Sequence, residues 1–255
     1  MSEIRLGSYR VVETIGSGAL STIYRAVQEP VGRTVALKAL KTQIAPTSSF
    51  GEQLEREAKI LADLAHPNVV LLLDHGRSPS GRPYLVLEHV EGASLQDLLR
   101  KKRTLSPEAA LAVALQVCAA LEHVHARGVV HRDVKPGNLL CARSGVVKIV
   151  DFGIAQRART ASVHDALGAE GITPSGRPAP EPVKDAFGTP AYMSPEQILG
   201  DFVDGRSDLF SLGVVLYEAL SGTRPFEAVG EDKARRAPEL RARRQAAAPL
   251  RERAP

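Results

Sequence analysis

The segment that most strongly indicates the fold is His131-Arg132-Asp133-Val134-Lys135-Pro136-Gly137-Asn138. A second segment, Asp151-Phe152-Gly153, begins thirteen residues after Asn138. The first segment offers an Asp that can accept a hydroxyl proton, a Lys that can meet a phosphate, and an Asn that can bind a metal ion. The second segment offers a further Asp for the same metal. In phosphoryl transfer the protein mainly positions the reacting groups and neutralises the charge of the phosphates, and these side chains can do both.

A second informative segment lies near the N-terminus. Gly16-Ser17-Gly18 follows a predicted strand, and Ser21 stands where a third glycine would complete the pattern. Glycines let backbone amides lie close over a triphosphate, although such a pattern alone is weak evidence. Lys38 then falls in an otherwise apolar strand, where an unpaired buried ammonium would be costly. We therefore expect anions beside Lys38, namely phosphates and a carboxylate that orients it.

Hydrophobic periodicity divides the chain into two parts. Residues 9–40 alternate as a strand meander, residues 50–64 carry a helical apolar stripe, and two more strands follow before residue 88. After residue 91 the pattern becomes helical. A long helix is expected to begin at Ser106 and end at Gly128, apolar almost all round and buried, with Cys118 as a packing residue. Residues 157–188 lack periodicity and are expected to form a long mobile loop.

Composition excludes several classes of protein. The formal net charge is +4, but residues 227–255 hold eight Lys/Arg against five Asp/Glu, so most of the imbalance lies there and no nucleic-acid surface is expected. We find no secretion signal and expect no membrane segment. The two cysteines are far apart, which favours neither a disulfide nor a zinc site. A cytoplasmic location is the expectation.

Together these motifs resemble the eukaryotic-type (Hanks-type) protein Ser/Thr kinases, in the form common in bacteria. The resemblance covers residues 9–226 and implies an α+β, two-lobed fold. The N-lobe, residues 9–88, would be a small antiparallel sheet with one helix, and the C-lobe, residues 91–226, would be mainly helical.

The resemblance assigns roles to the motif residues, with ATP and Mg²⁺ as cofactors. Asp133 would be the catalytic base, Lys135 would reach the transferring phosphoryl group, and Lys38 would be oriented by a carboxylate. Glu57 is the best match for that carboxylate, with Glu55 and Glu52 as the alternatives. Asn138 and Asp151 would bind the metal. The nucleotide would lie against Ile15, Gly16, Ser17, Gly18, Ser21, Ile23, Ala36, Lys38, Leu87, Glu88, Val90 and Leu140.

The same resemblance implies protein substrates. Lys135 favours Ser/Thr over Tyr, and Thr189 would bond Asp133 and Lys135. Arg132 implies regulation by phosphorylation of the loop at residues 157–188. Autophosphorylation in trans is part of the same expectation. The candidate sites are Thr160, Ser162, Thr173 and Ser175. Asp208 would anchor His131 within a hydrophobic spine.

The resemblance stops near Phe226, so the C-lobe is expected to be incomplete. Ala, Arg and Pro make up 18 of the 29 residues in 227–255, which predicts a poorly ordered tail. Glu196 would then lack its usual arginine partner, and apolar surface of the C-lobe would be exposed. Two alternatives therefore stay open: a kinase-like ATP-binding or scaffold protein, and a small-molecule phosphotransferase of the same broad fold.

Overall fold

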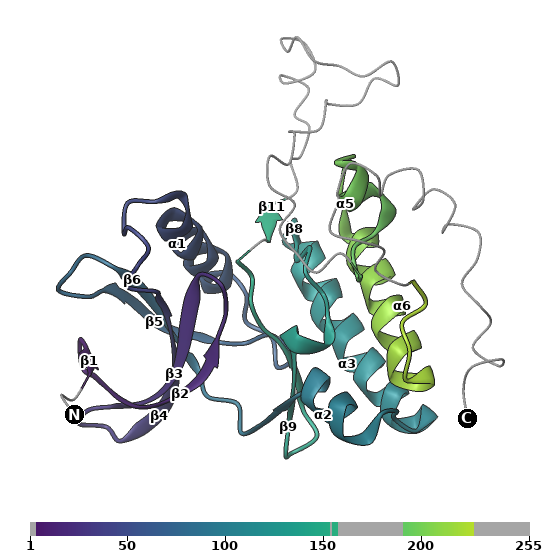
Figure 1. Ribbon diagram of the computed structural model, residues 1–255, viewed down its shortest axis with the longest axis horizontal. Coiled ribbons are helices and arrows are strands. Elements are labelled where there is room, and N and C mark those ends of the chain that lie inside the picture. Colours follow the sequence, from purple (N-terminus) through teal and green to yellow (C-terminus); the bar gives the residue numbers. More distant parts are fainter. Residues whose placement is uncertain (1–3, 154, 158–190, 227–255) are drawn as a thin grey trace, which may run out of the picture. The chain divides into compact units, whose positions relative to one another are not determined.

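The computed structural model describes residues 4–153, 155–157 and 191–226 (Figure 1). It divides into two compact units. The first comprises Met1–Ala93 and Leu140–Gly153, and the second comprises Ser94–Leu139 and Ile154–Pro255. Asp151 therefore belongs by its contacts to the first unit. Residues 158–188 of the loop expected at 157–188 lie outside the described residues, as do Thr189 and the segment 227–255.

The first unit is built on a six-stranded antiparallel sheet with the order β1-β2-β3-β4-β6-β5 (Figure 1). Its core combines aromatic and β-branched side chains of the central strands, including Tyr9, Val35, Tyr84 and Val86. One helix packs on β4 and β6. The elements are β1 (Arg5–Leu6), β2 (Tyr9–Ser17), β3 (Ser21–Gln28), β4 (Arg33–Leu40), α1 (Ser49–Ala62), β5 (Leu72–Arg77) and β6 (Pro83–Glu88).

A small sheet of order β10-β9-β7 carries the segment that leads to Asp151. Its strands are β7 (Gly92–Ser94), β9 (Leu139–Ala142) and β10 (Val147–Ile149). Gly92 is required there, because a Cβ on it would lie 2.0 Å from the carbonyl oxygen of Cys141. Asn68 ties β10 to the segment between α1 and β5, since its side-chain Nδ2 donates to the Val147 carbonyl at 2.8 Å and its own carbonyl accepts from the Ile149 N–H.

The second unit is mainly helical. Its elements are α2 (Leu95–Lys102), α3 (Pro107–Ala126), β8 (Val129–Val130), the 3-10 turn η1 (Pro136–Asn138), β11 (Gln156–Arg157), α5 (Pro195–Leu199) and α6 (Gly205–Ser221). Helices α3 and α6 pack on each other, and β8 pairs with β11. As predicted, Ser106 caps α3 through a hydrogen bond to the Ala109 N–H. An antiparallel sheet with one helix, and a helical second unit, confirm the predicted α+β two-lobed fold class.

One prediction about α3 is wrong. The helix is buried along one face only, through residues such as Val117 and Leu121, whereas Leu111 and Leu115 are 59% and 63% exposed. Cys118 is also exposed, so it is not a packing residue. Small Ala residues make a helix look apolar all round without requiring burial of every face.

By length and hydropathy, α3 is the one helix among the described residues that could cross a membrane. That finding differs from the sequence-based expectation of no such segment. It is weak evidence for a membrane span, because the buried face of α3 packs on α6, as a core helix of a globular unit does.

Candidate active site

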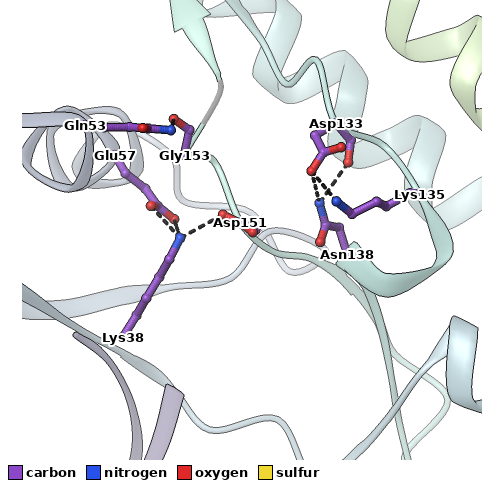
Figure 2. A network of polar contacts seen from close by, with 8 residues as sticks. All are labelled: Lys38, Gln53, Glu57, Asp133, Lys135, Asn138, Asp151 and Gly153. Atoms are coloured by element: carbon purple, nitrogen blue, oxygen red, sulfur yellow. Dashed lines mark hydrogen bonds and ion pairs between the residues drawn. The ribbon is translucent and has the colours of Figure 1, made fainter. Parts of the chain in front are cut away.

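Lys38 is the buried cation of the first unit. It lies in β4 between strand partners Ile23 on β3 and Leu85 on β6. Its ammonium donates to both carboxylate oxygens of Glu57 on α1, at 2.8 and 2.6 Å (Figure 2). Lys38 is 7% exposed and Glu57 is 1% exposed, so each charge depends on the other for its partner in the interior.

The two alternative carboxylates of α1 lie elsewhere. Glu55 pairs with Arg77 on β5, and Glu52 lies 3.9 Å from Arg56 with 68% of its side chain exposed. Glu57 is the one of the three on the buried face of the helix, because its neighbours on that face, Leu54 and Leu61, pack into the core. The helical phase of α1 therefore selects Glu57 as the partner of Lys38.

Asp151 is the second anion beside Lys38, with its Oδ1 accepting from the ammonium at 2.7 Å (Figure 2). Burial lowers the pKa of Lys38, but the negative charges of Glu57 and Asp151 together outweigh that effect and hold its pKa above the ordinary value. Burial is also the largest influence on Glu57 and raises its pKa, against the opposing effect of Lys38. Lys38 is thus held as a charged donor between two carboxylates from different elements.

The backbone of Asp151-Phe152-Gly153 is held by two side chains of α1. Glu57 accepts a hydrogen bond from the Phe152 N–H, and Gln53 Nε2 donates to the Gly153 carbonyl at 2.5 Å (Figure 2). Asp151 has a φ of 66°, a left-handed conformation that a non-glycine residue keeps only when its surroundings enforce it. The sequence analysis did not identify Gln53. Its position one turn before Glu57, on the same side of the helix, is the signal that could have done so.

The glycine segment forms the turn between β2 and β3. The Gly18 N–H donates to the Ser21 carbonyl at 2.9 Å and closes the turn. Gly16 pairs with Ile23 across the hairpin. Ile15, one residue earlier, is 47% exposed. Ser21 is accommodated as the first residue of β3, where it pairs with Leu40, so its replacement of glycine leaves the hairpin intact.

The residues predicted to surround the purine all belong to the first unit. Ala36 and Leu87 are direct cross-strand partners on β4 and β6, Val90 follows β6, and Leu140 lies on β9. The Glu88 side chain is already engaged, since it accepts from the Leu71 N–H at 2.8 Å and pairs with Lys148 at 2.6 Å. The Glu88 N–H is also engaged, since it donates to the Leu71 carbonyl at 3.0 Å, so the backbone carbonyl is the group of residue 88 to consider for contact with a base.

The loop of residues 131–138 in the second unit, the candidate catalytic loop, brings three predicted residues together. Lys135 Nζ donates to Asp133 Oδ2 at 2.7 Å, and Asn138 Nδ2 donates to the same oxygen at 2.9 Å (Figure 2). Asn138 Nδ2 also bonds the Asp133 carbonyl at 2.8 Å. Asp133 is 8% exposed, so these two donors stabilise a carboxylate that has little contact with water.

Asp208, at the start of α6, holds the backbone of this loop from below, as the resemblance implied. It is fully buried, and its carboxylate accepts from the His131 N–H at 2.9 Å and from the Arg132 N–H at 2.7 Å. The ring of His125 on α3 lies 2.8 Å from the same carboxylate. The loop is therefore anchored to the α3–α6 pair, which is the core of the second unit.

Glu196 accepts a hydrogen bond from the Ser207 hydroxyl at 2.5 Å. The expectation that it lacks an arginine partner stays a prediction, because the arginine-rich segment 227–255 lies outside the described residues. Phe202 and Leu209 of this unit are 47% and 50% exposed. The expectation that an incomplete C-lobe exposes apolar surface stays a prediction, because it depends on the segment 227–255, outside the described residues.

The two predicted metal ligands belong to different units. Asp151 lies in the first unit and Asn138 in the second. Because Asn138 uses its Nδ2 on Asp133, its Oδ1 is the amide atom left for a cation, and the Asp151 carboxylate is 47% exposed. Hard oxygen ligands of this kind fit Mg²⁺. Among the described residues no cluster of three or more His, Cys, Asp or Glu could hold a metal by itself.

The fold and these two groups of side chains are those of a protein kinase domain. Comparison with known proteins agrees: a family model described as the protein kinase domain matches residues 9–251. The chain belongs to this family. The match extends past Phe226, the residue at which the recognisable motifs end.

Curated relatives narrow the family to bacterial Ser/Thr kinases of the Hanks type. A probable serine/threonine-protein kinase of Streptomyces coelicolor is 39% identical over 223 residues, 86% of this chain and 31% of the relative. Serine/threonine-protein kinase PknB of Mycobacterium tuberculosis is 38% identical over 221 residues, 86% of this chain and 33% of the relative. A probable kinase of Clostridium perfringens is 36% identical over 218 residues, 86% of this chain and 29% of the relative. The chain thus spans about a third of the length of the curated relatives it matches.

Proposed function

We propose that this chain transfers the γ-phosphoryl group of Mg-ATP to Ser and Thr hydroxyls of proteins. The observation that carries the proposal is the buried ammonium of Lys38, held between Glu57 and Asp151. A protein rarely maintains such a charge in its interior without a functional reason, because a packed apolar group would be as stable or more stable. Recognition of phosphate by a fixed cation provides that reason.

In this proposal each group of the first unit has a separate task. Lys38 binds the α- and β-phosphates and Glu57 orients it. The glycine segment covers the phosphates with backbone amides. Asp151, with Asn138 of the second unit, would hold Mg²⁺, which when bound neutralises charge on the phosphates.

The second unit would supply the proton acceptor. Both hydrogen bonds to the Asp133 side chain end on Oδ2, so we assign Oδ1 as the oxygen that accepts the substrate hydroxyl proton. Lys135 lies at 2.7 Å from Asp133, from where its ammonium can counter negative charge on the transferring phosphoryl group. The proton moves from the hydroxyl to Asp133 as the hydroxyl oxygen attacks the γ-phosphorus, and the bond from that phosphorus to the β–γ bridging oxygen breaks, so that ADP leaves.

The proposed specificity for Ser and Thr is supported by Lys135 and by the relatives, which are named as serine/threonine-protein kinases. Regulation by loop phosphorylation, autophosphorylation in trans and a cytoplasmic location belong to the proposal as well. The candidate phosphorylation sites lie outside the described residues. A mass-spectrometric map of active enzyme that finds no phosphate on Thr160, Ser162, Thr173 or Ser175 would contradict the regulatory part.

The test of the function is a transfer assay with Mg-ATP and a generic Ser/Thr-containing protein. We expect phosphate incorporation by the wild-type chain and its loss in Asp133→Asn and Lys38→Met. Equal incorporation by wild type and both variants would reject the enzymatic proposal. Stabilisation by Mg-ATP without transfer would instead support a nucleotide-binding protein.

A further inference from the structure

The peptide bond between Arg132 and Asp133 is held from both sides. Its carbonyl accepts a hydrogen bond from Gln197 Nε2 at 2.8 Å, and its N–H donates to His131 Nδ1 at 3.2 Å. Arg132 itself has a φ of 67°, so the chain enters this peptide in a conformation that is unfavourable for a non-glycine residue. External hydrogen bonds are therefore needed to keep the orientation that the next residue, Asp133, inherits.

Gln197 divides its side-chain amide between two elements. Its Oε1 accepts from the Ser194 N–H at 3.0 Å and from the Ser194 hydroxyl at 3.2 Å, as part of the capping box that begins α5. Its Nε2 is then directed at the Arg132 carbonyl. Reversing the amide would place N–H against N–H at Ser194 and oxygen against oxygen at Arg132, so the network allows one orientation.

Asp208 and Gln197 hold complementary groups of the same loop. Asp208 accepts the N–H groups of His131 and Arg132, whereas Gln197 donates to the carbonyl of Arg132. Without Gln197, the Arg132–Asp133 peptide itself would be held only through its N–H, by the 3.2 Å contact with His131 Nδ1, and its carbonyl could turn away. The carbonyl contact removes that freedom.

We propose that Gln197 is a positioning residue for catalysis: it couples the N-terminus of α5 to the catalytic loop and fixes the direction of the Asp133 carboxylate. This inference rests on the proposed function, because Asp133 is the proton acceptor of that reaction. The competing account is that Gln197 only caps α5.

Gln197→Glu separates the two accounts. A capping box uses Glu as well as Gln, so the variant keeps the acceptor for Ser194. It replaces the donor with a carboxylate oxygen that faces the Arg132 carbonyl. We expect kcat to fall about 10- to 100-fold, because small displacements of a reacting group have effects of that size. The KM for ATP should change little, since the residues assigned to the α- and β-phosphates lie in the other unit.

The pH profile provides a second readout. A protonated Glu carries a donor again, so the ratio of the kcat of Gln197→Glu to that of wild type should rise as the pH is lowered toward about 5. A residue that only caps a helix would show no such recovery. Unchanged kcat at neutral pH would overturn the proposal.

Two further variants separate positioning from instability. Gln197→Met removes both hydrogen-bonding roles without adding a charge and should also lose kcat. Ser106→Ala removes the cap of α3 in the same unit, and it should lower the melting temperature while kcat stays within about twofold of wild type. Loss of kcat in Ser106→Ala equal to that of Gln197→Met would overturn the proposal.

Amide hydrogen exchange tests the same contact without requiring activity. In Gln197→Glu, peptides that contain residues 130–134 should exchange faster than in wild type under identical conditions, and in Ser106→Ala they should not. If the wild-type chain shows no transfer, the proposed function fails, yet exchange still decides whether Gln197 holds this loop. Equal exchange in wild type and Gln197→Glu would overturn the inference on its own.

Discussion

The lysine cluster of the first unit and the catalytic loop of the second are built in opposite ways. Lys38, Glu57 and Asp151 come from three segments, and the two partners lie 19 and 113 positions from Lys38 in the sequence. Asp133, Lys135 and Asn138 lie within six consecutive residues. The first group exists only if the sheet, α1 and the segment after β10 pack together, whereas the second group forms its contacts locally.

The local cluster nevertheless depends on distant residues for its orientation. Its side chains are neighbours in sequence, but its backbone is held by Asp208, 77 residues from His131, and by Gln197, 65 residues from Arg132. The distributed cluster is held by its own charges. Mutations should therefore separate the two: changes within the loop should alter rate more than stability, and changes within the lysine cluster should alter both.

The largest effect is expected for Asp133→Asn. Removal of the proposed proton acceptor should lower kcat by about 10²- to 10⁴-fold, while an Asn of the same shape leaves the fold nearly unchanged. Steady-state transfer assays measure the rate, and nucleotide-dependent thermal shifts report whether Mg-ATP still binds. A loss of binding comparable to the loss of rate would show that the two clusters are not separable in this way.

Lys38→Met should reduce stability as well as activity. It leaves Glu57 buried without its cation, and breaking a buried pair in this way costs about 3–5 kcal/mol. Burial already raises the pKa of Glu57, so in the variant the folded state favours its protonated form. The folded pKa then exceeds the unfolded one, and the penalty relative to wild type should shrink as the pH falls.

Urea unfolding of wild type and Lys38→Met between about pH 8 and about pH 5 measures the difference in their unfolding free energies. The double variant Lys38→Met with Glu57→Gln is the matched control, because it lacks the titrating group. The difference in unfolding free energy between this double variant and wild type should vary less with pH. A pH-independent penalty in the single variant would mean that Glu57 is not the source.

Asp208→Asn tests the remote anchor of the local cluster. Asn keeps one acceptor oxygen but sets an NH₂ group against a backbone donor. Hydrogen bonds to a charged group contribute about 1.5–3 kcal/mol, so we expect a loss of about 2 kcal/mol in unfolding free energy and a reduced kcat. Asp204→Asn, at the N-cap of the same helix with an exposed partner, should lose much less. Equal losses would argue that removal of a negative charge at the N-terminus of α6, and not loss of the loop contact, explains the effect.

Tyr9→Phe gives the smallest effect and serves as a reference remote from both clusters. The Tyr9 hydroxyl donates to Asp74 at 2.8 Å, and its removal should cost about 1 kcal/mol. Burial and Asp74 raise the pKa of Tyr9 to about 12. Because the folded pKa lies above the unfolded value of about 10, the contribution is complete below about pH 10 and is lost as the pH rises toward 12.

The measurement is the difference in unfolding free energy between wild type and Tyr9→Phe at neutral and alkaline pH. It should be largest at neutral pH and diminish above about pH 10. A constant difference across this range would contradict a folded-state pKa shift at Tyr9.

Several features could be predicted because they depend on residues close in sequence. The strand meander, the Ser106 cap of α3 and the Asp133-Lys135-Asn138 group follow from local pattern and spacing. The buried face of α3 could not be predicted, because Ala and Leu on all sides carry no periodic signal. Gln53 and Gln197 were missed for another reason: each bonds a backbone carbonyl, and a carbonyl is present at every residue.

The sequence by itself determined the family, the chemical groups of both clusters and the class of fold, because motifs of this length restrict residue types at fixed spacing. The tertiary structure decided which glutamate meets Lys38, which face of α3 is buried and what holds Arg132 in its left-handed conformation. Those outcomes depend on helical phase and on hydrogen bonds between distant segments. Both are set by packing, since only the folded chain brings the partners within hydrogen-bond distance.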